Sequence, residues 1–456
     1  MKKEKLFGTD GIRGTPGEYP LTDDMLIMIG KGIANFLLCN YGRKTTGHPK
    51  VIIGNDTRIS CCKIESILSN EMTSSGVDVI SVGIIPTPGL AFLINKHLAD
   101  IGLMISASHN RPEDNGIKFF SSSGHKLSEK NEELIERIIF NKQMNSSKEL
   151  AKETGSLTQI KNLCREYKQY LKSTVSDLDL KGFKIVVDCG NGAVSSIAPE
   201  LFKEIGSKVY SIGDNPDGMN INKGCGVLHP DNMSKLVVKY GADIGFAFDG
   251  DGDRLILSDE NGVILDGDYI MAIVGIQLLK RNKLPKDTIV ATVMSNWGLE
   301  QAIQKAGGKI IRTPVGDKYI LETMSKHGFS FGGEQSGHII FLEHSTTGDA
   351  LVTALQILKI MKETNKKLSQ LKRRMRKLPQ ILINVKVRQK SPLDSIARIA
   401  AAISQSNSRL KGNGRLLVRY SGTEQLARVM AEGKDRLLIQ EAAHFVAKTI
   451  KECLGE

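Results

Sequence analysis

The chain repeats one local pattern of hydrophobic and polar positions. A short run rich in Val, Ile and Phe ends in a loop of Gly, Ser, Asn and Asp, and a stretch with helical spacing follows. Five such runs are Val51–Ile53, Ile101–Ile105, Ile185–Val187, Ile244–Phe248 and Ile289–Val293. Short apolar runs alternating with helices are typical of α/β domains with a mainly parallel sheet. Because ligands bind outside the carboxyl ends of such strands, the loops after these runs are candidate sites.

Other segments predict individual elements. Leu255–Leu257 and Val263–Leu265 flank an Asn-Gly pair at 261 and 262, which predicts a β-hairpin. Glu132–Ile139 and Leu163–Leu171 are predicted helices, and the polar segment Asn141–Gly155 separates them. This polar segment is a candidate connection between domains.

A second candidate connection is the basic stretch Lys366–Pro379. It predicts a helix that stops at proline. One face of that helix is apolar, formed by Leu368, Leu371, Met375 and Leu378. Without interleaved aromatic residues, a packed helix with a solvated basic back explains this stretch better than a nucleic-acid or membrane patch.

Length and composition indicate a globular protein. The 456 residues fit three or four domains, and 40% hydrophobic with 25% charged residues argues against disorder. The longest apolar run, Tyr269–Leu279, is too short to span a bilayer, and the first ten residues lack the apolar core of a signal peptide. Seven cysteines without CxxC spacing favour reduced thiols. We therefore predict a cytoplasmic protein with no membrane association.

The net charge of +12 allows two interpretations. A nucleic-acid-binding protein is one, but only 5% of the residues are aromatic and we find no recognised binding motif. Anionic small substrates such as phosphate esters need only a few well-placed cations. We favour the second interpretation and predict no nucleic-acid partner.

The segment Ile105–Phe120, ISASHNRPEDNGIKFF, offers a serine nucleophile. Ser106 and Ser108 both follow a predicted strand. Serine is a weak nucleophile that needs a base or a cation nearby. His109 is adjacent, but neighbours on an extended chain point to opposite sides, so we do not expect a Ser–His pair. From these residues alone, a connecting loop with a helix N-cap is the simpler interpretation.

The segment DGDGDR, residues 249–254, places three carboxylates at alternating positions between glycines. Oxygen-only ligands suit a hard cation, Mg²⁺ or Ca²⁺. Three carboxylates this close repel one another without a counter-ion, so we predict a metal site. An EF-hand with Glu260 at its last ligand position is an alternative. However, Arg254 occupies the position where that loop needs glycine, and the flanking segments are predicted strands.

Two later loops carry groups that suit sugars and phosphates. GEQSGH, residues 333–338, offers carboxylate, amide, hydroxyl and imidazole groups for sugar hydroxyls or an amine. Its serine lies outside the G-x-S-x-G frame of hydrolases. RYSGTE, residues 419–424, combines an arginine fork with hydroxyls and backbone amides, which suits phosphate, and Arg428 adds positive charge. Taken singly, each loop is also explained as an ordinary turn.

Together and in this order, these loops resemble the α-D-phosphohexomutase family across essentially the whole chain. Its opening signature is similar to FGTDGIRG at Phe7–Gly14, its phosphoserine loop to ISASHN, its metal loop to DGDGDR, its sugar loop to GEQSGH and its phosphate loop to RYSGTE. Five motifs in register are specific, although no single one is. FGTDGIRG with GEQSGH is most similar to the phosphoglucosamine mutase branch. The phosphomannomutase and phosphoglucomutase branches, which share the mechanism, are the alternative.

The resemblance implies a multidomain α/β fold. Three related α/β domains with mixed sheets and a smaller C-terminal α+β domain are expected around a central cleft, with one loop from each. We place the phosphoserine loop in a domain at 1–150, the metal loop in 151–257, the sugar loop in 258–366 and the phosphate loop in 367–456.

The resemblance also implies a reaction and its residues. The expected enzyme is a mutase, an intramolecular phosphotransferase, that interconverts glucosamine 6-phosphate and glucosamine 1-phosphate with Mg²⁺ as cofactor. The implied catalytic residues are Ser108 (as a phosphoserine), Lys118, His338 and Arg13. The implied metal ligands are Ser108, Asp249, Asp251 and Asp253. The implied substrate-binding residues are Arg254, Glu334, Ser336, Arg419, Ser421, Gly422 and Thr423. The expected partners are a phosphorylated hexosamine and its 1,6-bisphosphate, as intermediate or activator, and a homodimer is left open.

The sequence departs from the family pattern in several loops. These departures are Arg111, Val227-Leu228, Pro314 and Gln425. None removes an implied ligand, but each changes the shape of a loop, so the sugar preference is less firmly implied than the reaction. From other classes, a phosphatase with an aspartate nucleophile and a basic nucleic-acid-binding protein are the alternatives.

Overall fold

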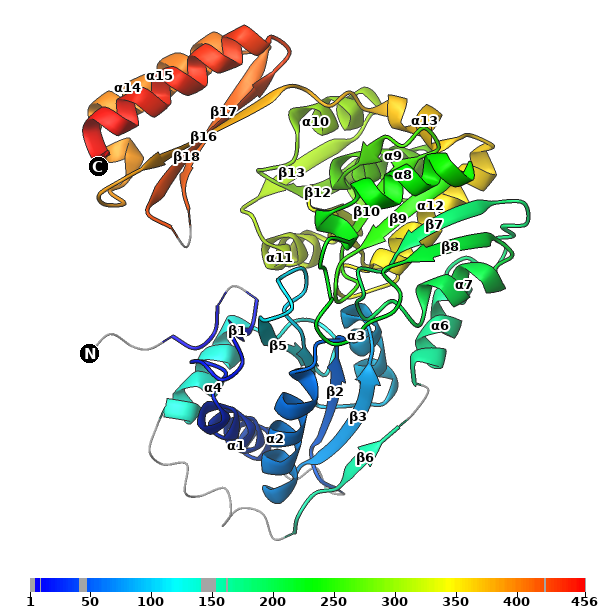
Figure 1. The fold of residues 1–456 in the computed structure, drawn as a ribbon. Coiled ribbons are helices and arrows are strands. Elements are labelled where there is room, and N and C mark those ends of the chain that lie inside the picture. The colour runs from blue at the N-terminus through cyan, green and yellow to red at the C-terminus, as the bar shows by residue number, and fades with distance from the viewer. Residues whose placement is uncertain are drawn as a thin grey trace.

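The computed structural model describes residues 5–8, 10–40, 47–140, 153–160, 163–421 and 424–455. These residues form four sheets with helices packed against them (Figure 1). The predicted strands all occur, and the first three sheets mix parallel and antiparallel pairs. The prediction of three related α/β units and a smaller C-terminal unit is confirmed.

The first sheet has six strands in the order β1-β5-β4-β2-β3-β6. Its strands are β1 (Ile12–Gly14), β2 (Lys50–Asn55), β3 (Asp78–Ile84), β4 (Ile101–Ile105), β5 (Asn115–Ser121) and β6 (Leu157–Gln159). Its helices are α1 (Asp23–Asn40), α2 (Cys61–Ser74), α3 (Thr87–Lys96) and α4 (Glu129–Phe140). Val51 and Ile53 join the core under α1, α2 and α4, whereas Ile52 joins the core under α3. Burial on both faces explains why β2 is a continuous apolar run.

The second sheet has five strands in the order β11-β10-β9-β7-β8. They are β7 (Lys184–Asp188), β8 (Lys208–Ile212), β9 (Ile244–Phe248), β10 (Leu255–Asp259) and β11 (Ile264–Leu265). The helices of this part are α6 (Leu163–Ser173), α7 (Ala198–Glu204) and α8 (Asp231–Tyr240), with a 3₁₀ turn η2 (Gly226–Leu228). The predicted hairpin is confirmed. Its turn is held by Asp259, whose Oδ1 accepts from the backbone N–H groups of Asn261 and Val263.

The third sheet has four strands in the order β13-β12-β14-β15. They are β12 (Thr288–Thr292), β13 (Lys309–Thr313), β14 (Phe331–Gly333) and β15 (Ile339–Phe341). The accompanying helices are α9 (Gly267–Lys280), α10 (Trp297–Lys305), α11 (Asp317–His327) and α12 (Ala350–Thr364), with a 3₁₀ turn η3 (Pro285–Asp287). The longest apolar run forms α9 and contributes to the largest hydrophobic core. No helix in the part of the chain that the structure describes is long and apolar enough to cross a membrane.

The C-terminal unit is a three-stranded antiparallel sheet in the order β16-β18-β17. Its strands are β16 (Gln380–Lys386), β17 (Gly414–Tyr420) and β18 (Leu426–Gly433). A 3₁₀ turn η5 (Leu393–Ser395) precedes α14 (Ala397–Leu410), and α15 (Arg436–Leu454) ends the unit. The two helices cover one face of the sheet (Figure 1). Asp435 caps α15, because its Oδ1 accepts from the backbone N–H groups of Leu437 and Leu438.

The basic connection before β16 is less helical than the sequence predicted. It forms α13 (Leu368–Leu371) and a 3₁₀ turn η4 (Lys372–Arg374) and then becomes extended. The four apolar positions are all buried, as their spacing predicted. The helix prediction is wrong beyond Arg374, because the backbone N–H and C=O of Leu378 both bond to the side chain of Asn296. Lys372 and Arg374 also contact protein groups, Asp259 Oδ2 and the carbonyl of Ile273 respectively.

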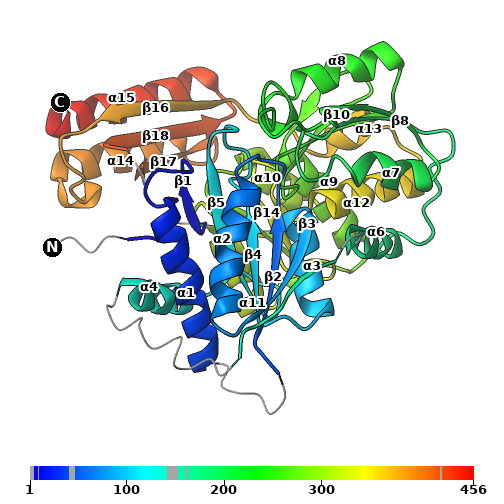
Figure 2. The same ribbon diagram turned by 60° about the horizontal axis from the view of Figure 1, so that its bottom comes forward.

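Loops from all four units line one shared cavity. The turned view shows the C-terminal unit and the second unit at opposite sides, with the first and third units between them (Figure 2). The domain boundaries that we predicted after residues 150, 257 and 366 stay predictions. The first lies in residues outside those described, as does most of the polar segment Asn141–Gly155, and the second falls within β10.

Candidate active site

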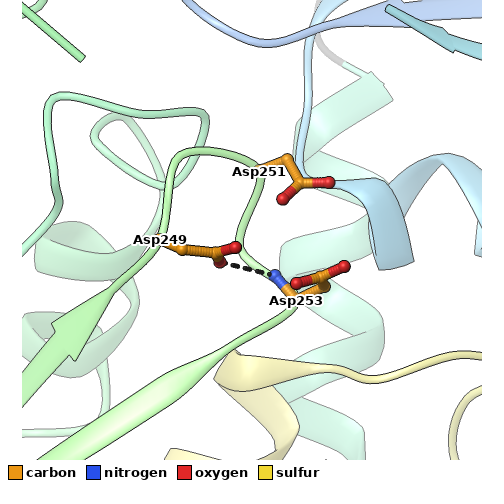
Figure 3. A group of neighbouring side chains, drawn as sticks. All are labelled: Asp249, Asp251 and Asp253. Atoms are coloured by element: carbon orange, nitrogen blue, oxygen red, sulfur yellow. Dashed lines mark hydrogen bonds between the residues drawn. The ribbon is translucent and has the colours of Figure 1, made fainter. Parts of the chain in front are cut away.

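The acidic loop joins β9 to β10 and gathers its carboxylates around one space (Figure 3). Asp249, Asp251 and Asp253 are buried, and one oxygen from each lies within 4.8 Å of the others. Gly252 has a φ of +72°, a conformation that a side chain disfavours, and this lets the loop turn tightly. Asp249 Oδ1 accepts from the backbone N–H groups of Asp253 and Arg254, which fixes the turn.

The oxygens of this loop fit a divalent cation. Oδ1 of Asp251 and Oδ1 of Asp253 are buried and have no hydrogen-bond partner among the described residues. Burial and repulsion from Asp253 and Asp251 raise the pKa of Asp249 well above its usual range. Buried oxygens without hydrogen-bond partners, on carboxylates that repel one another, are the donor set that a hard metal ion neutralises. This cluster can therefore hold a metal ion.

The EF-hand alternative does not fit this geometry. The loop is flanked by two strands rather than two helices. Glu260 lies in the hairpin turn, where its carboxylate accepts from the backbone N–H of Ser369 at 3.2 Å and from that residue's hydroxyl. It is engaged there and does not join the three aspartates.

The structure distinguishes the two candidate serines. Ser108 is buried, and its Oγ donates to Asp249 Oδ2 at 2.7 Å. Ser106 Oγ instead donates to Asp56 Oδ2 at 2.7 Å and accepts from the backbone N–H of Ser108. Ser108 is therefore the serine next to the acidic loop, and Ser106 supports its backbone.

The expectation that Ser108 and His109 point apart is wrong. His109 Nδ1 lies 3.4 Å from Ser108 Oγ. The reason is that Ser108 has a φ of +54°, so the backbone is left-handed there rather than extended. Burial and the charge of Arg254 lower the pKa of His109 to about 4. Since Arg254 Nη1 is 2.9 Å from the same ring nitrogen, His109 is a poorly placed base for the serine.

Lys118 lies on β5 against the acidic loop. Its Nζ is 2.6 Å from Asp251 Oδ2 and 3.4 Å from Asp253 Oδ2, and the side chain is buried. Although burial acts in the opposite direction, the charges of Asp10 and Asp251 raise its pKa above the usual range. Lys118 thus places a positive charge beside the carboxylates.

His338 faces the same loop from the third domain. Its Nδ1 lies 3.6 Å from Asp253 Oδ2, and its Nε2 lies 3.6 Å from Asp317 Oδ2. The backbone N–H of Gly348 donates to Nε2 at 3.1 Å. These two carboxylates raise the pKa of His338, outweighing burial. The imidazole is therefore held between two acidic groups from different segments.

Sequence reasoning missed three charged residues in this site. Lys126 Nζ lies 2.5 Å from Asp10 Oδ1 and 2.5 Å from Asp317 Oδ2, so it joins the first and third domains. Asp10 also pairs with Arg13. Asp10 belongs to FGTDGIRG, and Asp317 lies three residues after Pro314, one of the departures from the family pattern, so both lie in segments that the sequence analysis had singled out. Lys126 belongs to none of the quoted motifs, and only the tertiary structure brings it here.

A cavity of about 720 Å³ opens beside these groups. It is lined by segments of all four units. The predicted site residues that line it are Arg13, Asp253, Arg254, Glu334, His338 and Arg419. Ser336 is exposed next to the cavity, with its Oγ 3.4 Å from Glu334 Oε2. Ser421 does not line it and faces Glu424 instead, and Gly422 and Thr423 lie outside the described residues.

Two arginines face each other across the C-terminal strands. Arg419 on β17 is directly opposite Arg428 on β18. Like charges in this position destabilise a sheet unless an anion lies between or beside them. Arg428 Nε is buried and has no partner among the described groups, although its Nη2 pairs with Glu424 at 2.9 Å. The pair is therefore suited to binding an anion at the cavity's edge.

Gly348 gives a test of how closely His338 must be held. A Cβ atom at this position would lie 2.5 Å from Cε1 and Nε2 of the imidazole. We expect Gly348→Ala to displace the ring and, if His338 has the catalytic role that the resemblance implies, to lower kcat by roughly 10²-fold, the effect of a shift of about 1 Å at a catalytic group. Gly275→Ala, in α9, is the control, because its Cβ would meet nothing closer than 3.1 Å. Equal activity of the two variants would contradict the expectation that activity depends on the exact position of the His338 ring.

Comparisons with known proteins agree along the whole chain. Four family models match: phosphoglucomutase/phosphomannomutase alpha/beta/alpha domain I at residues 4–146, domain II at 165–262, domain III at 266–378 and the C-terminal domain at 382–449. The chain is 48% identical over 453 residues to a phosphoglucosamine mutase of Geobacter sp. (strain M21), covering 99% of each. It is 48% identical over 448 residues to a phosphoglucosamine mutase of Desulfotalea psychrophila, covering 98% of each.

Solved structures show the same fold. A phosphoglucomutase/phosphomannomutase family protein from Burkholderia thailandensis superposes with a TM-score of 0.80 at 23% identity, covering 100% of both chains. An N-acetylphosphoglucosamine mutase from Aspergillus fumigatus, in complex with GlcNAc-6P and magnesium, gives a TM-score of 0.61 at 19% identity and covers 98% of this chain and 95% of that one. The chain therefore belongs to the phosphoglucomutase/phosphomannomutase family of phosphohexose mutases, which are intramolecular phosphotransferases.

Proposed function

We propose that this chain acts as a phosphoglucosamine mutase, interconverting glucosamine 6-phosphate and glucosamine 1-phosphate. The observation that carries the proposal is the 2.7 Å contact between Ser108 Oγ and Asp249, within a cluster of three buried carboxylates beside a cavity rich in arginine. The names of the full-length relatives support the choice of sugar. Ser108 would carry the phosphoryl group as a phosphoserine.

The cofactor that suits this site is Mg²⁺. Asp249, Asp251, Asp253 and the phosphorylated Ser108 would hold it, since all four offer oxygen ligands. When bound, the ion neutralises negative charge on the phosphoryl group in transfer. Magnesium in the Aspergillus fumigatus structure supports this choice.

Transfer proceeds in two half-reactions, and each moves one phosphoryl group between Ser108 Oγ and a sugar oxygen. The C1 hydroxyl of glucosamine 6-phosphate attacks phosphorus, the bond from phosphorus to Ser108 Oγ breaks, and a bond to the sugar oxygen forms. The product is the 1,6-bisphosphate. After this turns end over end, Ser108 Oγ attacks the other phosphate and the bond to the C6 oxygen breaks. We infer that His338 and Lys118, which both lie against the acidic loop, exchange protons with the sugar hydroxyl and the serine oxygen.

In both orientations of the sugar, the cavity must bind the phosphate group that lies far from Ser108. Arg419 lines it, and Ser421, Gly422 and Thr423 follow closely in the sequence. Arg13 and Arg254 add positive charge near the reacting group. Glu334 Oε1 accepts from the backbone N–H of Gly316 at 3.0 Å, which orients the carboxylate for sugar contacts together with Ser336. Closure of the four units would exclude water, which competes for the phosphoserine.

Three further expectations stand beside this function. Seven free cysteines favour a reducing, cytoplasmic setting. The domain boundaries after residues 150, 257 and 366, and a homodimer, stay predictions.

Parallel assays with three sugars test the choice of substrate. We expect kcat/KM for glucosamine 6-phosphate to exceed that for glucose 6-phosphate and mannose 6-phosphate by at least about tenfold, or about 1.4 kcal/mol. The physical reason is that the cavity presents the carboxylate of Glu334, which favours an amine over a hydroxyl. One enzyme preparation at one Mg²⁺ concentration serves all three assays. A larger value for glucose or mannose phosphate would assign the chain to the alternative branch.

A further inference from the structure

We propose that Arg58 and Asn222 are positioning residues for phosphoryl transfer. They hold the backbone carbonyl of Ser108 from two sides, and this hold turns the serine hydroxyl toward Asp249. The inference rests on the proposed function, because Ser108 must carry phosphate for its orientation to matter. Neither residue belongs to the four loops that carry the chemistry.

Arg58 organises the serine loop from inside the first domain. It is among the largest fully buried side chains, and Asp56 Oδ2 accepts from its Nε at 2.9 Å. Its terminal nitrogens donate to four backbone carbonyls of one loop, those of Ser108, Asn110, Arg111 and Asp114. One guanidinium thus gathers seven residues of chain around itself. A planar fork with five N–H donors can do this, whereas a single ammonium cannot.

Asn222 reaches the same loop from the second domain. Its Nδ2 donates to the carbonyl of Ser108 at 2.8 Å and to the carbonyl of Asn110 at 3.0 Å. The backbone N–H of Asn222 donates to Gly190 O at 2.8 Å, which anchors the residue in its own domain. Two of the four carbonyls that Arg58 binds are therefore also bound from across the domain boundary.

This double hold explains the conformation of Ser108. A serine at φ +54° is unfavourable for an L-residue and persists only where surrounding contacts determine it. The carbonyl of Ser108 receives Arg58 Nη2 at 3.1 Å and Asn222 Nδ2 at 2.8 Å, which fixes the peptide plane after the serine. In this conformation Oγ meets Asp249. Without the hold, the loop can relax toward an ordinary conformation that turns Oγ away.

The fit between the two loops leaves little room for another arrangement. A Cβ atom at Gly250 would lie 2.6 Å from Ser108 O and 3.0 Å from Asn222 Nδ2. The acidic loop, the serine loop and Asn222 thus meet at one point. Asn222 comes from the same domain as the acidic loop. Its contact with Ser108 therefore aligns the serine with the three carboxylates of that loop.

The test is Asn222→Gly, with Asn365→Gly as its matched control. Both asparagines have left-handed backbones, with φ of +57° and +49°, so glycine suits either position. Asn365 is the exposed C-cap of α12, far from the serine loop in the chain. The measurements are kcat and KM with glucosamine 6-phosphate, the single-turnover transfer of ³²P from phosphorylated Ser108 to that sugar, and the melting temperature.

For Asn222→Gly we expect kcat and the single-turnover rate to fall together by roughly 10- to 100-fold, with KM within about twofold of wild type. Asn365→Gly should match wild type in all three kinetic measurements. Asn222→Gly should melt somewhat below Asn365→Gly, because it removes two buried hydrogen bonds, whereas the Asn365 side chain is exposed. A merely structural role would lower the melting temperature without this loss of kcat at unchanged KM. Transfer by Asn222→Gly within twofold of the control, or a loss confined to KM, would overturn the proposal.

Arg58→Lys supplies a second measurement. It keeps the charge but loses the fork, so we expect a larger fall in kcat than for Asn222→Gly. If this variant does not fold, Asn222→Gly decides alone. Activity of Arg58→Lys equal to wild type would also overturn the proposal. Absence of transfer in wild-type enzyme would instead refute the proposed function, and this inference with it.

Discussion

Ser108→Ala is expected to abolish mutase activity, with a loss on the order of 10⁴-fold or more, because it removes the atom that carries the phosphoryl group. Ser108 Oγ is the hydroxyl that meets the acidic loop, at 2.7 Å from Asp249 Oδ2. The change also removes one hydrogen bond from a buried carboxylate, so a small loss of stability accompanies it. The measurements are mutase turnover with glucosamine 6-phosphate and ³²P incorporation from the 1,6-bisphosphate, mapped to a phosphopeptide.

Ser106→Ala is the control for this variant. It removes a buried hydroxyl two residues away, one that bonds to Asp56 instead of the acidic loop. We expect it to retain labelling at position 108 and a measurable turnover. A phosphatase that uses an aspartate as nucleophile would survive Ser108→Ala and release free phosphate. Isomerisation at a normal rate by Ser108→Ala would therefore refute the phosphoserine mechanism.

The acidic cluster could be predicted from the sequence because its geometry is local, whereas the roles of the other loops were implied only by their resemblance to the family. Asp249, Asp251 and Asp253 converge through the two-residue repeat of one turn, and the strand before them is a continuous apolar run. The same local reasoning identified the hairpin of β10 and β11. Where a group's position depends on neighbours within a few residues, pattern and spacing carry the needed information.

What could not be predicted depends on partners far along the chain. Lys126 meets Asp317 at 191 residues' separation, and Asn222 meets Ser108 at 114. Nothing near either residue signals the contact. The left-handed backbone of Ser108 was missed for a related reason: serine has no strong local preference for it, so long-range contacts must impose it. This one torsion made the prediction about His109 wrong.

Spacing alone also could not settle the structure of the basic connection. The apolar positions at 368, 371, 375 and 378 suit a helix, and all are buried. After Arg374 the chain is extended, because the side chain of Asn296 takes both hydrogen bonds of the Leu378 backbone. A tertiary contact thus overrode a helical pattern while keeping the same residues in the core.

Asp251→Asn is expected to lower kcat/KM by roughly 10²–10³-fold and to weaken the dependence of activity on Mg²⁺. This fall in kcat/KM is the size expected when one preorganised charge-stabilising group is removed. Oδ1 of Asp251 is buried without a partner among the described residues, and Oδ2 already accepts from Lys118 Nζ at 2.6 Å and from the hydroxyl of Thr87. An amide keeps the size of the side chain but removes its charge, so a cation there has one carboxylate fewer.

The loss could arise from the broken contact with Lys118 rather than from the metal, so the Mg²⁺ dependence is the deciding measurement. We expect the Mg²⁺ concentration for half-maximal activity to rise by at least about tenfold, and Mn²⁺ binding, followed by its paramagnetic resonance signal, to weaken in parallel. Asp259→Asn, at the other end of β10, removes a buried carboxylate whose partners in the described part of the chain are the hairpin turn and Lys372. It should lower stability and leave the Mg²⁺ dependence unchanged. If Asp251→Asn kept the wild-type Mg²⁺ dependence while losing activity, the carboxylate would serve Lys118 and not a metal. If wild-type enzyme stayed fully active after exhaustive chelation, a metal role for all three aspartates would be wrong.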